Sequence, residues 1–374
     1  MKIFIGKENS CNLNYMRDLL YSEFIINGHE IVKEPEDADI IIFPDTCCCT
    51  EYNLQYTLFY INDILSRKKE NAKTFLTGCI TRKFTHNPEN FDVNEWLNNN
   101  IDYIFPQNNN YEILKTIFKK EFEDYPYNDF GYSRPLNDET AEMYISNGCM
   151  NNCSFCKLTF QKYPLKSVDI NEVKESIDRI DELGFKELDI KGTNISQYGY
   201  DLYKEYKLPE IIEYIENKNN INKVRYIGFS YKDAIKNNFA PVIRDSKKTD
   251  TLGGSLESGS NRLLKLIRKG FTKEEFLSFI YEIRKKYPKN LRLNVISGFP
   301  TETIEDILET IAVLDEVKPL GIDLCRYTNS SIIDSNNYPQ LSPEEIQEHT
   351  RIYEKILRKK NIQTDIVGDG YNYN

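Results

Sequence analysis

Three cysteines close together form the feature that most restricts what this chain can become. Cys149, Cys153 and Cys156 stand in the run Asn-Gly-Cys-Met-Asn-Asn-Cys-Ser-Phe-Cys, a C-x3-C-x2-C spacing. Three thiolates on one short loop match three corners of a cubic 4Fe–4S cluster, which leaves one iron without a protein ligand. Such an iron can bind a small molecule through nitrogen and oxygen, whereas a fully ligated cluster can only pass electrons. The spacing therefore predicts a cluster with chemistry of its own.

A zinc knuckle and a disulfide framework are the alternatives for these cysteines. Zinc usually takes a fourth Cys or His nearby, but His29, His86 and His349 all lie far away in the sequence. Disulfides need an oxidising compartment, and Met1 leads straight into a strand-like segment with no export signal. We therefore expect an iron–sulfur cluster in a cytoplasmic protein.

The cysteine loop also resembles the signature of the radical-SAM enzymes, because Phe155 is an aromatic residue just before the last cysteine. In that superfamily S-adenosylmethionine chelates the open iron and is cut reductively to a 5′-deoxyadenosyl radical. The resemblance implies S-adenosylmethionine as the small molecule that this loop serves.

Size and charge narrow the possible functions. The 374 residues are enough for two domains, each with its own core. Hydrophobic residues make up 40% and charged residues 28%, as in ordinary globular proteins, and no apolar run reaches the length that spans a bilayer. The net charge of −10 argues against broad, sequence-independent nucleic-acid binding, which depends on neutralising phosphates.

Strand-like and helix-like segments alternate over residues 1–122, which predicts a flavodoxin-like parallel α/β domain. In such sheets the ligand groups gather at the carboxyl ends of the strands. Cys11, Cys47 and Cys79 each follow a predicted strand, so these distant cysteines could meet at one sheet edge. The expected strands are 2–5, 39–43, 74–77 and 101–105, and the expected helices are 14–26 and about 51–67.

Residues 123–138 have no clean periodicity and are rich in turn formers, so we expect a linker there. Residues 139–374 then alternate again, with six strand–helix units that predict a partial (β/α)6 barrel with its active site at the carboxyl ends of the strands. A final helix begins with Ser-Pro-Glu-Glu at Ser342, a good helix start. The expected strands are 142–146, 187–191, 224–229, 251–256, 291–297 and 321–324, and the expected helices are 171–183, 208–217, 273–286, 303–316 and 342–360.

Residues flanking the three early cysteines add a more specific resemblance. Cys11 is followed by Asn14, Cys47 is preceded by Thr46 and followed by Glu51, and Cys79 follows Thr-Gly. These runs resemble the Gly-Cys-x-x-Asn, Asn-Thr-Cys-x-x-x-Glu and Thr-Gly-Cys motifs of the radical-SAM methylthiotransferases. Ser10 and Asp45 stand where that family has glycine and asparagine.

Three segments of the barrel continue this similarity in the expected order. Residues 192–199 are similar to the family's Gly-x-Asn-x-x-x-Tyr-Gly run, residues 256–262 to its Gln-Ser-Gly-Ser segment, and residues 295–302 to its Gly-Phe-Pro-x-Glu strand end. The resemblance covers almost the whole chain and implies a partial radical-SAM barrel behind the amino-terminal domain.

The resemblance implies that Cys11, Cys47 and Cys79 hold a second, auxiliary 4Fe–4S cluster that also has an open iron. An enzyme that delivers sulfur needs such an iron to carry a sulfide or methylsulfide. The alternative is that these cysteines are small buried hydrophobic residues at strand ends. Cys48 and Cys49 could each replace Cys47 as ligand or carry sulfur temporarily, but we favour a structural role for both, since adjacent side chains point in different directions.

Several residues at the predicted strand ends suit S-adenosylmethionine. Phe155 could set its backbone against adenine, Asn194 could bind a ribose or carboxylate oxygen, and Gly298 could let the backbone approach adenine closely. Glu257 could accept ribose hydroxyls, Ser258 could donate to the cofactor, and Arg262 could neutralise the methionine carboxylate. For each residue the alternative is a helix cap or a surface ion pair. No catalytic side chain can be named.

The stretches expected to face substrate depart from the family. Family members that act on transfer RNA or a ribosomal protein carry a carboxyl-terminal β-barrel domain, which we expect this chain to lack. Residues 326–332 and 158–164 differ from the family's Arg-Pro-Gly-Thr and Pro-Tyr-x-Arg-Gly runs. We therefore predict that a methylthio group is inserted at an unactivated C–H of a peptide or protein, plausibly a ribosomally made precursor.

Two other functions remain open on the sequence alone. One is methylthiolation of adenosine in tRNA, and the other is a non-catalytic two-cluster redox protein. The enzymatic readings require an external electron donor such as flavodoxin or ferredoxin, and the composition gives no reason to expect a membrane partner.

Overall fold

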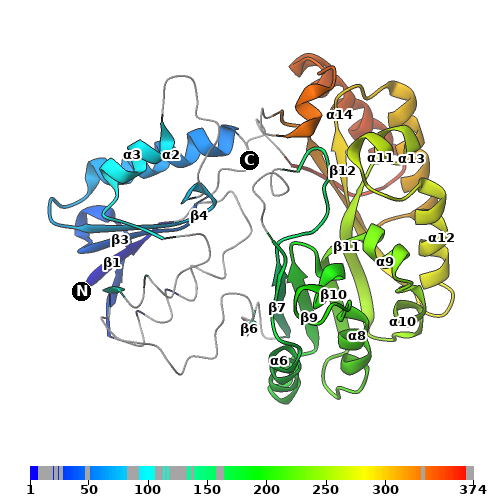
Figure 1. The fold of residues 1–374 in the computed structure, drawn as a ribbon, viewed down its shortest axis with the longest axis horizontal. Coiled ribbons are helices and arrows are strands. Elements are labelled where there is room, and N and C mark those ends of the chain that lie inside the picture. Colours follow the sequence, from blue (N-terminus) through cyan, green and yellow to red (C-terminus); the bar gives the residue numbers. More distant parts are fainter. Residues whose placement is uncertain are drawn as a thin grey trace. The chain divides into compact units, whose positions relative to one another are not determined.

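The computed structural model describes residues 1–6, 20, 24, 28–46, 51–81, 92–105, 113, 116–117, 133–135, 139–156, 164–329 and 333–367. The chain divides into two compact units, residues 1–129 and residues 130–374. The division falls within residues 123–138, while the proposed domain boundaries at 122 and 139 stay a prediction. Figure 1 shows both units coloured along the sequence.

The first unit is built on a parallel sheet with the strand order β2-β1-β3-β4-β5. This is the order of flavodoxin-like folds, so the predicted fold class is confirmed. Short runs of Ile, Phe and Leu form the central strands because β-branched and aromatic side chains pack well on a sheet covered on both faces. The strands are β1 (Lys2–Ile5), β2 (Glu30–Val32), β3 (Ile40–Thr46), β4 (Lys73–Gly78) and β5 (Tyr103–Ile104).

Each face of this sheet has its own apolar core. On one face, α2 (Glu51–Arg67) and α3 (Val93–Asn100) bury Leu54, Ile61 and Leu97 against Ile41 and Leu76. On the other face, the helical residues Leu20 and Phe24 pack against Ile3, Ile40 and Ile42. Burial on both faces explains why the strands lack an alternating polar pattern.

The second unit is a barrel-like sheet with the order β14-β13-β12-β11-β10-β9-β7-β6. All pairs from β7 to β14 are parallel, and β6 and β8 pair with β7 in the antiparallel sense. The six predicted strands are all present. The strands are β6 (Ser133–Pro135), β7 (Thr140–Asn147), β8 (Lys166–Ser167), β9 (Glu187–Gly192), β10 (Lys223–Phe229), β11 (Thr249–Glu257), β12 (Asn290–Ser297), β13 (Gly321–Arg326) and β14 (Thr364–Val367).

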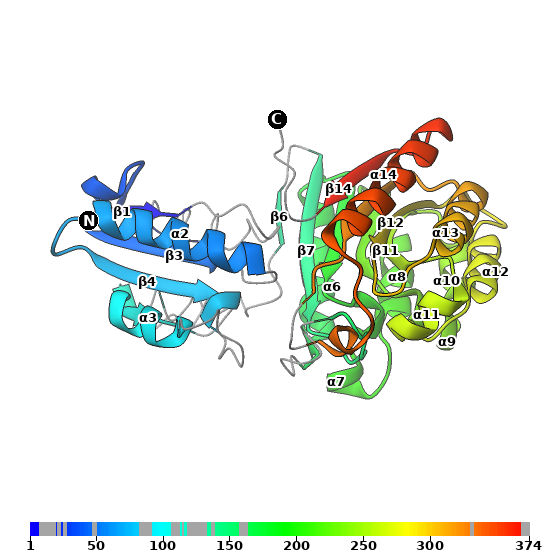
Figure 2. The ribbon, with the colours of Figure 1, turned by 90° about the horizontal axis from the view of Figure 1, so that it is seen from above.

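Helices cover the outer face of this sheet (Figures 1 and 2). Alternate strand residues such as Met143, Ile190, Tyr226 and Leu293 face them and form the core. The helices are α6 (Ile170–Glu182), α7 (Tyr200–Tyr203), α8 (Leu208–Glu216), α9 (Tyr231–Lys236), α10 (Ala240–Asp245), α11 (Asn261–Ile267), α12 (Lys273–Ile283), α13 (Ile304–Val317) and α14 (Pro343–Lys359). Short 3-10 turns lie at η1 (Pro35–Asp37), η2 (Cys79–Thr81), η3 (Ile195–Gln197) and η4 (Asp334–Asn337).

Local capping fixes where the long helices begin. Ser342 accepts a hydrogen bond from the backbone N–H of Glu345, whose carboxylate accepts one from the Ser342 N–H in return. The same reciprocal arrangement starts α12 at Thr272 and α13 at Thr303. The predicted start of the final helix at Ser342 is therefore confirmed.

Four strands differ from the expectation, and one of them is the two-residue β8 (Lys166–Ser167), which is too short for a sequence pattern to indicate. β2 and β14 were not expected, because each is short and half-exposed and so carries a weak apolar signal. β6 lies in the segment predicted as linker and pairs with β7 through Ser133, Arg134 and Pro135. Of the predicted helix 14–26, only Leu20 and Phe24 lie within the described residues. Among the described helices, none is long and apolar enough to cross a bilayer.

Candidate functional site

The loop of the three cysteines leaves the carboxyl end of β7. Gly148 lies just before Cys149 with a φ of +81°, and a Cβ there would lie 2.0 Å from the carbonyl oxygen of Pro164. Only glycine fits, because both the left-handed backbone and the close approach exclude a side chain. Cys149, Cys153 and Cys156 are all half-buried thiols without disulfide bonds.

Ser154 holds the middle of the cysteine loop in place. Its backbone N–H donates to the carbonyl of Ile267 at 3.0 Å, and its hydroxyl donates to the carbonyl of Leu266 at 2.9 Å. Its own carbonyl accepts a hydrogen bond from the Ser335 N–H at 2.9 Å. The loop is therefore pinned by the end of α11 on one side and by η4 on the other.

Burial governs the acidity of two of the loop thiols. It raises the pKa of Cys149, against the hydrogen bond that the Asn194 amide donates to this sulfur. It also raises the pKa of Cys153 to about 11, although the nearby ammonium of Lys269 acts in the opposite direction. Metal binding requires thiolates, so these positions favour the ionised form only when a cation or a cationic cluster is bound.

Two buried polar atoms near the loop have no hydrogen-bond partner within the described part of the chain. They are the Oδ1 of Asn194 and the Oγ of Ser146, at side chains exposed by only 3% and 1%. Ser146 ends β7 directly before the loop, and Asn194 follows β9. Because an unsatisfied buried acceptor is costly, both atoms suit a polar ligand beside Cys149.

Glu257 ends β11 with its carboxylate buried and its backbone left-handed, with a φ of +68°. Burial raises the pKa of this carboxyl group, and the Lys269 ammonium lies 3.6 Å from it. Non-glycine residues seldom adopt such a backbone without cause. The carboxylate is therefore held at the strand end by the surrounding structure, consistent with its predicted place at the cofactor.

Ser258 and Arg262 are occupied by contacts within the protein. The Ser258 hydroxyl lies 3.1 Å from that of Thr310 and accepts the Ser260 N–H. The Arg262 guanidinium forms an ion pair with the buried carboxylate of Asp306 and donates to the carbonyl of Thr301 at 2.6 Å. These contacts fasten α11 to α13, so the structure favours a structural role for Arg262.

Gly298 and Phe155 are placed mainly by packing. Gly298 has a φ of +78°, and a Cβ there would lie 2.7 Å from Cγ2 of Ile346 on α14. Its N–H donates to the buried Glu302 carboxylate at 2.7 Å. Phe155 packs at the edge of a small apolar cluster, which can keep water from the cysteine loop. That cluster consists of Leu263, Ile267, Ile296, Phe299, Tyr327 and Ile333.

The predicted auxiliary site is only partly within the described residues. Cys11, Cys47, Cys48 and Cys49 lie outside them. The backbone of Cys79 is described and opens η2 directly after β4, at the carboxyl end of a central strand. The assignment of Cys11, Cys47 and Cys79 to a second cluster stays a prediction.

Sequence reasoning missed Asp233, a carboxylate exposed by only 5% that lies close to Cys149. It accepts hydrogen bonds from Asn151, Asn194, Gln197 and Ser230. The sequence signal was a Ser-x-x-Asp helix start directly after a barrel strand. That pattern alone indicates a helix cap, and its partners come from distant segments.

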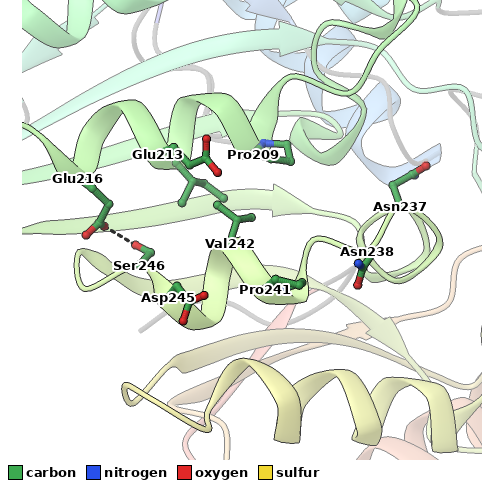
Figure 3. Close-up of a pocket in the computed structure, with 10 residues that line it drawn as sticks. Pro209, Glu213, Glu216, Asn237, Asn238, Pro241, Val242, Asp245 and Ser246 are labelled. Atoms are coloured by element: carbon green, nitrogen blue, oxygen red, sulfur yellow. Dashed lines mark hydrogen bonds between the residues drawn. The ribbon is translucent and has the colours of Figure 1, made fainter.

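A surface hollow of about 490 Å³ lies between α8 and α10 (Figure 3). Three of its polar side chains already have partners, since Glu216 accepts the Ser246 hydroxyl and Asp245 pairs with Arg244. Its lining includes none of the residues discussed above. This hollow is therefore not where the cysteine loop lies.

Comparison with known proteins supports one family. The model of the radical SAM superfamily matches residues 143–314. A threonylcarbamoyladenosine tRNA methylthiotransferase from Aquifex aeolicus, MtaB, is 25% identical over 367 residues, covering 94% of this chain and 86% of that protein. The ribosomal protein uS12 methylthiotransferase RimO from Thermosipho melanesiensis is 29% identical over 359 residues, covering 93% of this chain and 79% of that protein.

The radical SAM match and the similarity to MtaB and RimO over almost the whole chain support the radical-SAM methylthiotransferase family.

This methylthiotransferase also resembles solved radical-SAM structures. The radical S-adenosylmethionine methyltransferase TsrM from Kitasatospora setae matches with a TM-score of 0.57 at 11% identity, covering 90% of this chain and 77% of that one. The cobalamin-dependent radical enzyme OxsB matches with a TM-score of 0.52 at 14% identity, covering 97% and 61%. At such identities the likeness shows the fold alone.

These similarities indicate an enzyme that uses S-adenosylmethionine and two 4Fe–4S clusters. The alternative of a non-catalytic two-cluster redox protein is therefore not supported. Three thiols on one loop, with the unpartnered acceptors of Asn194 and Ser146 beside them, fit one cluster and a polar ligand.

Proposed function

We propose that this methylthiotransferase modifies a peptide or protein, plausibly a ribosomally made precursor peptide. The observation that carries the proposal is the charge on the concave face of the barrel. Successive side chains of a strand point to opposite faces of the sheet. One set packs against the helices, so the alternate set faces the concave side of the barrel. These side chains include acidic residues on several strands: Glu142, Glu187, Asp189, Asp323 and Asp365.

The basic side chains on this face are already paired. Lys191 pairs with Glu142, Arg225 with Glu187 and Asp189. Arg292 on β12 pairs with Asp323 on β13 and Asp365 on β14, at 2.6 and 2.7 Å. Phosphate binding needs uncompensated positive charge, which these pairs do not provide. Together with the net charge of −10, this favours a peptide over a polynucleotide.

Different residues would bind the two clusters and S-adenosylmethionine. We infer that Cys149, Cys153 and Cys156 hold one cluster and that Cys11, Cys47 and Cys79 hold the other. The open acceptors of Asn194 and Ser146 and the carboxylate of Glu257 would orient S-adenosylmethionine. Phe155 would exclude water. When bound, the cofactors supply the radical chemistry, and the protein orients the reacting groups and excludes water.

Mass spectrometry tests the substrate class. Short peptides encoded beside this gene are incubated with the anaerobically reconstituted enzyme, S-adenosylmethionine and a reductant. Replacement of one hydrogen by a methylthio group adds one carbon, one sulfur and two hydrogens. We expect this gain on a peptide. Unmodified peptides together with the same gain on an adenosine of total tRNA would overturn the proposal.

Modification of tRNA is the second candidate, because MtaB matches over 94% of this chain and its name specifies a tRNA substrate. It predicts binding to tRNA that weakens steeply with salt. A gel-shift experiment with total tRNA at two salt concentrations separates the two candidates, since a peptide enzyme should leave the tRNA unshifted at both.

A further inference from the structure

Asp233 lies in the first turn of α9 and is held there by the residue that starts the helix. The hydroxyl of Ser230 donates to Oδ2 of Asp233 at 2.6 Å, and the Asp233 N–H donates back to that hydroxyl oxygen at 3.4 Å. A carboxylate is stable at this place because the first turn of a helix presents unpaired N–H groups and a positive dipole end.

Three amide side chains from two other segments also donate to this carboxylate. Asn151 of the cysteine loop lies 3.1 Å from Oδ2, Asn194 lies 3.0 Å from the same oxygen, and Gln197 lies 3.2 Å from both oxygens. Within the described part of the chain, Asp233 forms no ion pair with a Lys or Arg. Its negative charge is therefore buried and solvated by neutral donors.

The amide residues that donate to Asp233 also contact the first cysteine of the loop, Cys149, or the residue next to it. The Asn194 amide that donates to Asp233 also lies 3.3 Å from the Cys149 sulfur, and the Asn151 N–H lies 3.4 Å from it. Oε1 of Gln197 accepts the Met150 N–H at 2.8 Å. Because a carboxylate only accepts hydrogen bonds, Asp233 decides which way each amide points. It thereby directs the Asn194 amide N–H to the sulfur and the Gln197 oxygen to the loop backbone.

We propose that Asp233 is a positioning residue for the cluster of Cys149, Cys153 and Cys156: it fixes the donors around the Cys149 sulfur and places a buried negative charge beside the cluster. The inference rests on the assignment of these cysteines in the proposed function. Net charge and hydrogen bonds to sulfur set the potential of iron–sulfur clusters. The charge of Asp233 opposes the arrival of an electron, so it keeps the midpoint potential low and makes the reduced cluster a stronger reductant.

The test is the midpoint potential of this cluster in Asp233→Asn. This change keeps the side-chain size but removes the charge. The full-length enzyme with both clusters is titrated with dithionite and followed by electron paramagnetic resonance. The signal that changes when S-adenosylmethionine is added identifies the cluster. We expect its potential to rise in Asp233→Asn and to return toward the wild-type value in Asp233→Glu.

Asp181→Asn is the matched control. Asp181 is also a buried carboxylate and accepts three backbone N–H groups, from Asn219, Asn220 and Ile221. These residues precede β10, so Asp181 lies at the amino ends of the strands, away from the cysteine loop. The Asp181→Asn substitution should lower the stability of the protein and leave the midpoint potential of the cluster unchanged. A potential in Asp233→Asn equal to that of the wild type would overturn the inference.

Asn194→Ala provides an independent arm if Asp233→Asn does not fold. It removes one N–H donor from the Cys149 sulfur but keeps the charge, so the potential should fall, opposite in sign to Asp233→Asn. An unchanged potential in Asn194→Ala would also overturn the inference. None of these titrations needs a substrate, so failure of the peptide proposal leaves their outcome readable. If no signal of the wild-type enzyme changes when S-adenosylmethionine is added, both this inference and the cluster assignment in the proposed function are overturned.

Discussion

The imidazole of His349 on α14 donates to the buried carboxylate of Glu302, with 2.9 Å between Nδ1 and Oε2. The same carboxylate accepts the Gly298 N–H at the end of β12 and the Tyr353 hydroxyl. One side chain thus links a strand end of the site to the carboxyl-terminal helix.

Stability should fall as the pH rises above the ordinary pKa of histidine. The hydrogen bond to Glu302 raises the pKa of His349 above 6.5, and burial raises the pKa of Glu302 above 4.5. In both cases the folded state binds more protons than the unfolded state, so stability falls with rising pH. The contribution of His349 is complete below pH 6.5 and is lost as the pH passes its raised pKa, whereas that of Glu302 is complete only below pH 4.5. We expect the free energy of unfolding, measured with urea, to fall over this pH range. His349→Gln should flatten this dependence, and an unchanged slope would contradict it.

Gly298→Ala should destabilise the barrel by about 2 to 4 kcal/mol, because the new Cβ meets Ile346 and the backbone has a positive φ. Gly184→Ala is the matched control. Gly184 has a φ of +85°, but nothing lies within 4 Å of the position of its Cβ. It should cost only about 1 kcal/mol. Equal losses in urea unfolding would show that the contact with Ile346 carries no energy.

Replacing Cys153 by Ala should halve the iron content after anaerobic reconstitution, from about eight to about four irons per chain, because one of two 4Fe–4S clusters loses a ligand. Cys325→Ala is the control, since Cys325 is another half-buried barrel thiol and burial raises its pKa to about 12. It should leave the iron content at the wild-type level. Iron is measured by a colorimetric assay, and the idea fails if both variants bind equal amounts.

Cys79→Ala tests the auxiliary site in the same way. It should also leave about four irons per chain, and the remaining signal should still respond to S-adenosylmethionine. A variant that keeps all its iron would contradict the assignment of Cys79.

Arg262→Met should lower the free energy of unfolding by about 1 to 2 kcal/mol, because Asp306 loses its cation in a site exposed by only 5%. The loss is limited, since Arg262 itself is 46% exposed and Asp306 keeps the Ser260 hydroxyl as donor. We expect the Kd for S-adenosylmethionine, measured by equilibrium dialysis, to stay within about twofold. A tenfold weaker Kd without loss of stability would restore the sequence-based role of Arg262.

The sequence predicted the sheet architecture well because its signals are local. Runs such as residues 40–43 and 291–297 are long enough to identify strands, and Thr303 and Ser342 mark helix starts through neighbours three residues away. β14 was not predicted because it is only four residues long, with three half-buried residues and one exposed residue. Its place is fixed by pairing with β13, which no local pattern reveals.

The candidate site was predictable only where the chemistry lies in one run of sequence. The cysteine loop has that property. Asp233 does not, because its role depends on amides from Asn151, Asn194 and Gln197, which only the fold brings together. Arg262 shows the opposite case, where a suitable residue type is taken by a partner from α13.

The hydrogen bond from the Ser335 N–H to the Ser154 carbonyl has a consequence for how the enzyme is made. The ribosome synthesises Ser154 long before Ser335, so the nascent cysteine loop lacks this support until nearly the entire barrel has emerged. Iron delivered at that earlier moment would meet thiols on a loop held from one side only. Loading of the cluster is therefore expected to follow completion of the polypeptide rather than to accompany its translation.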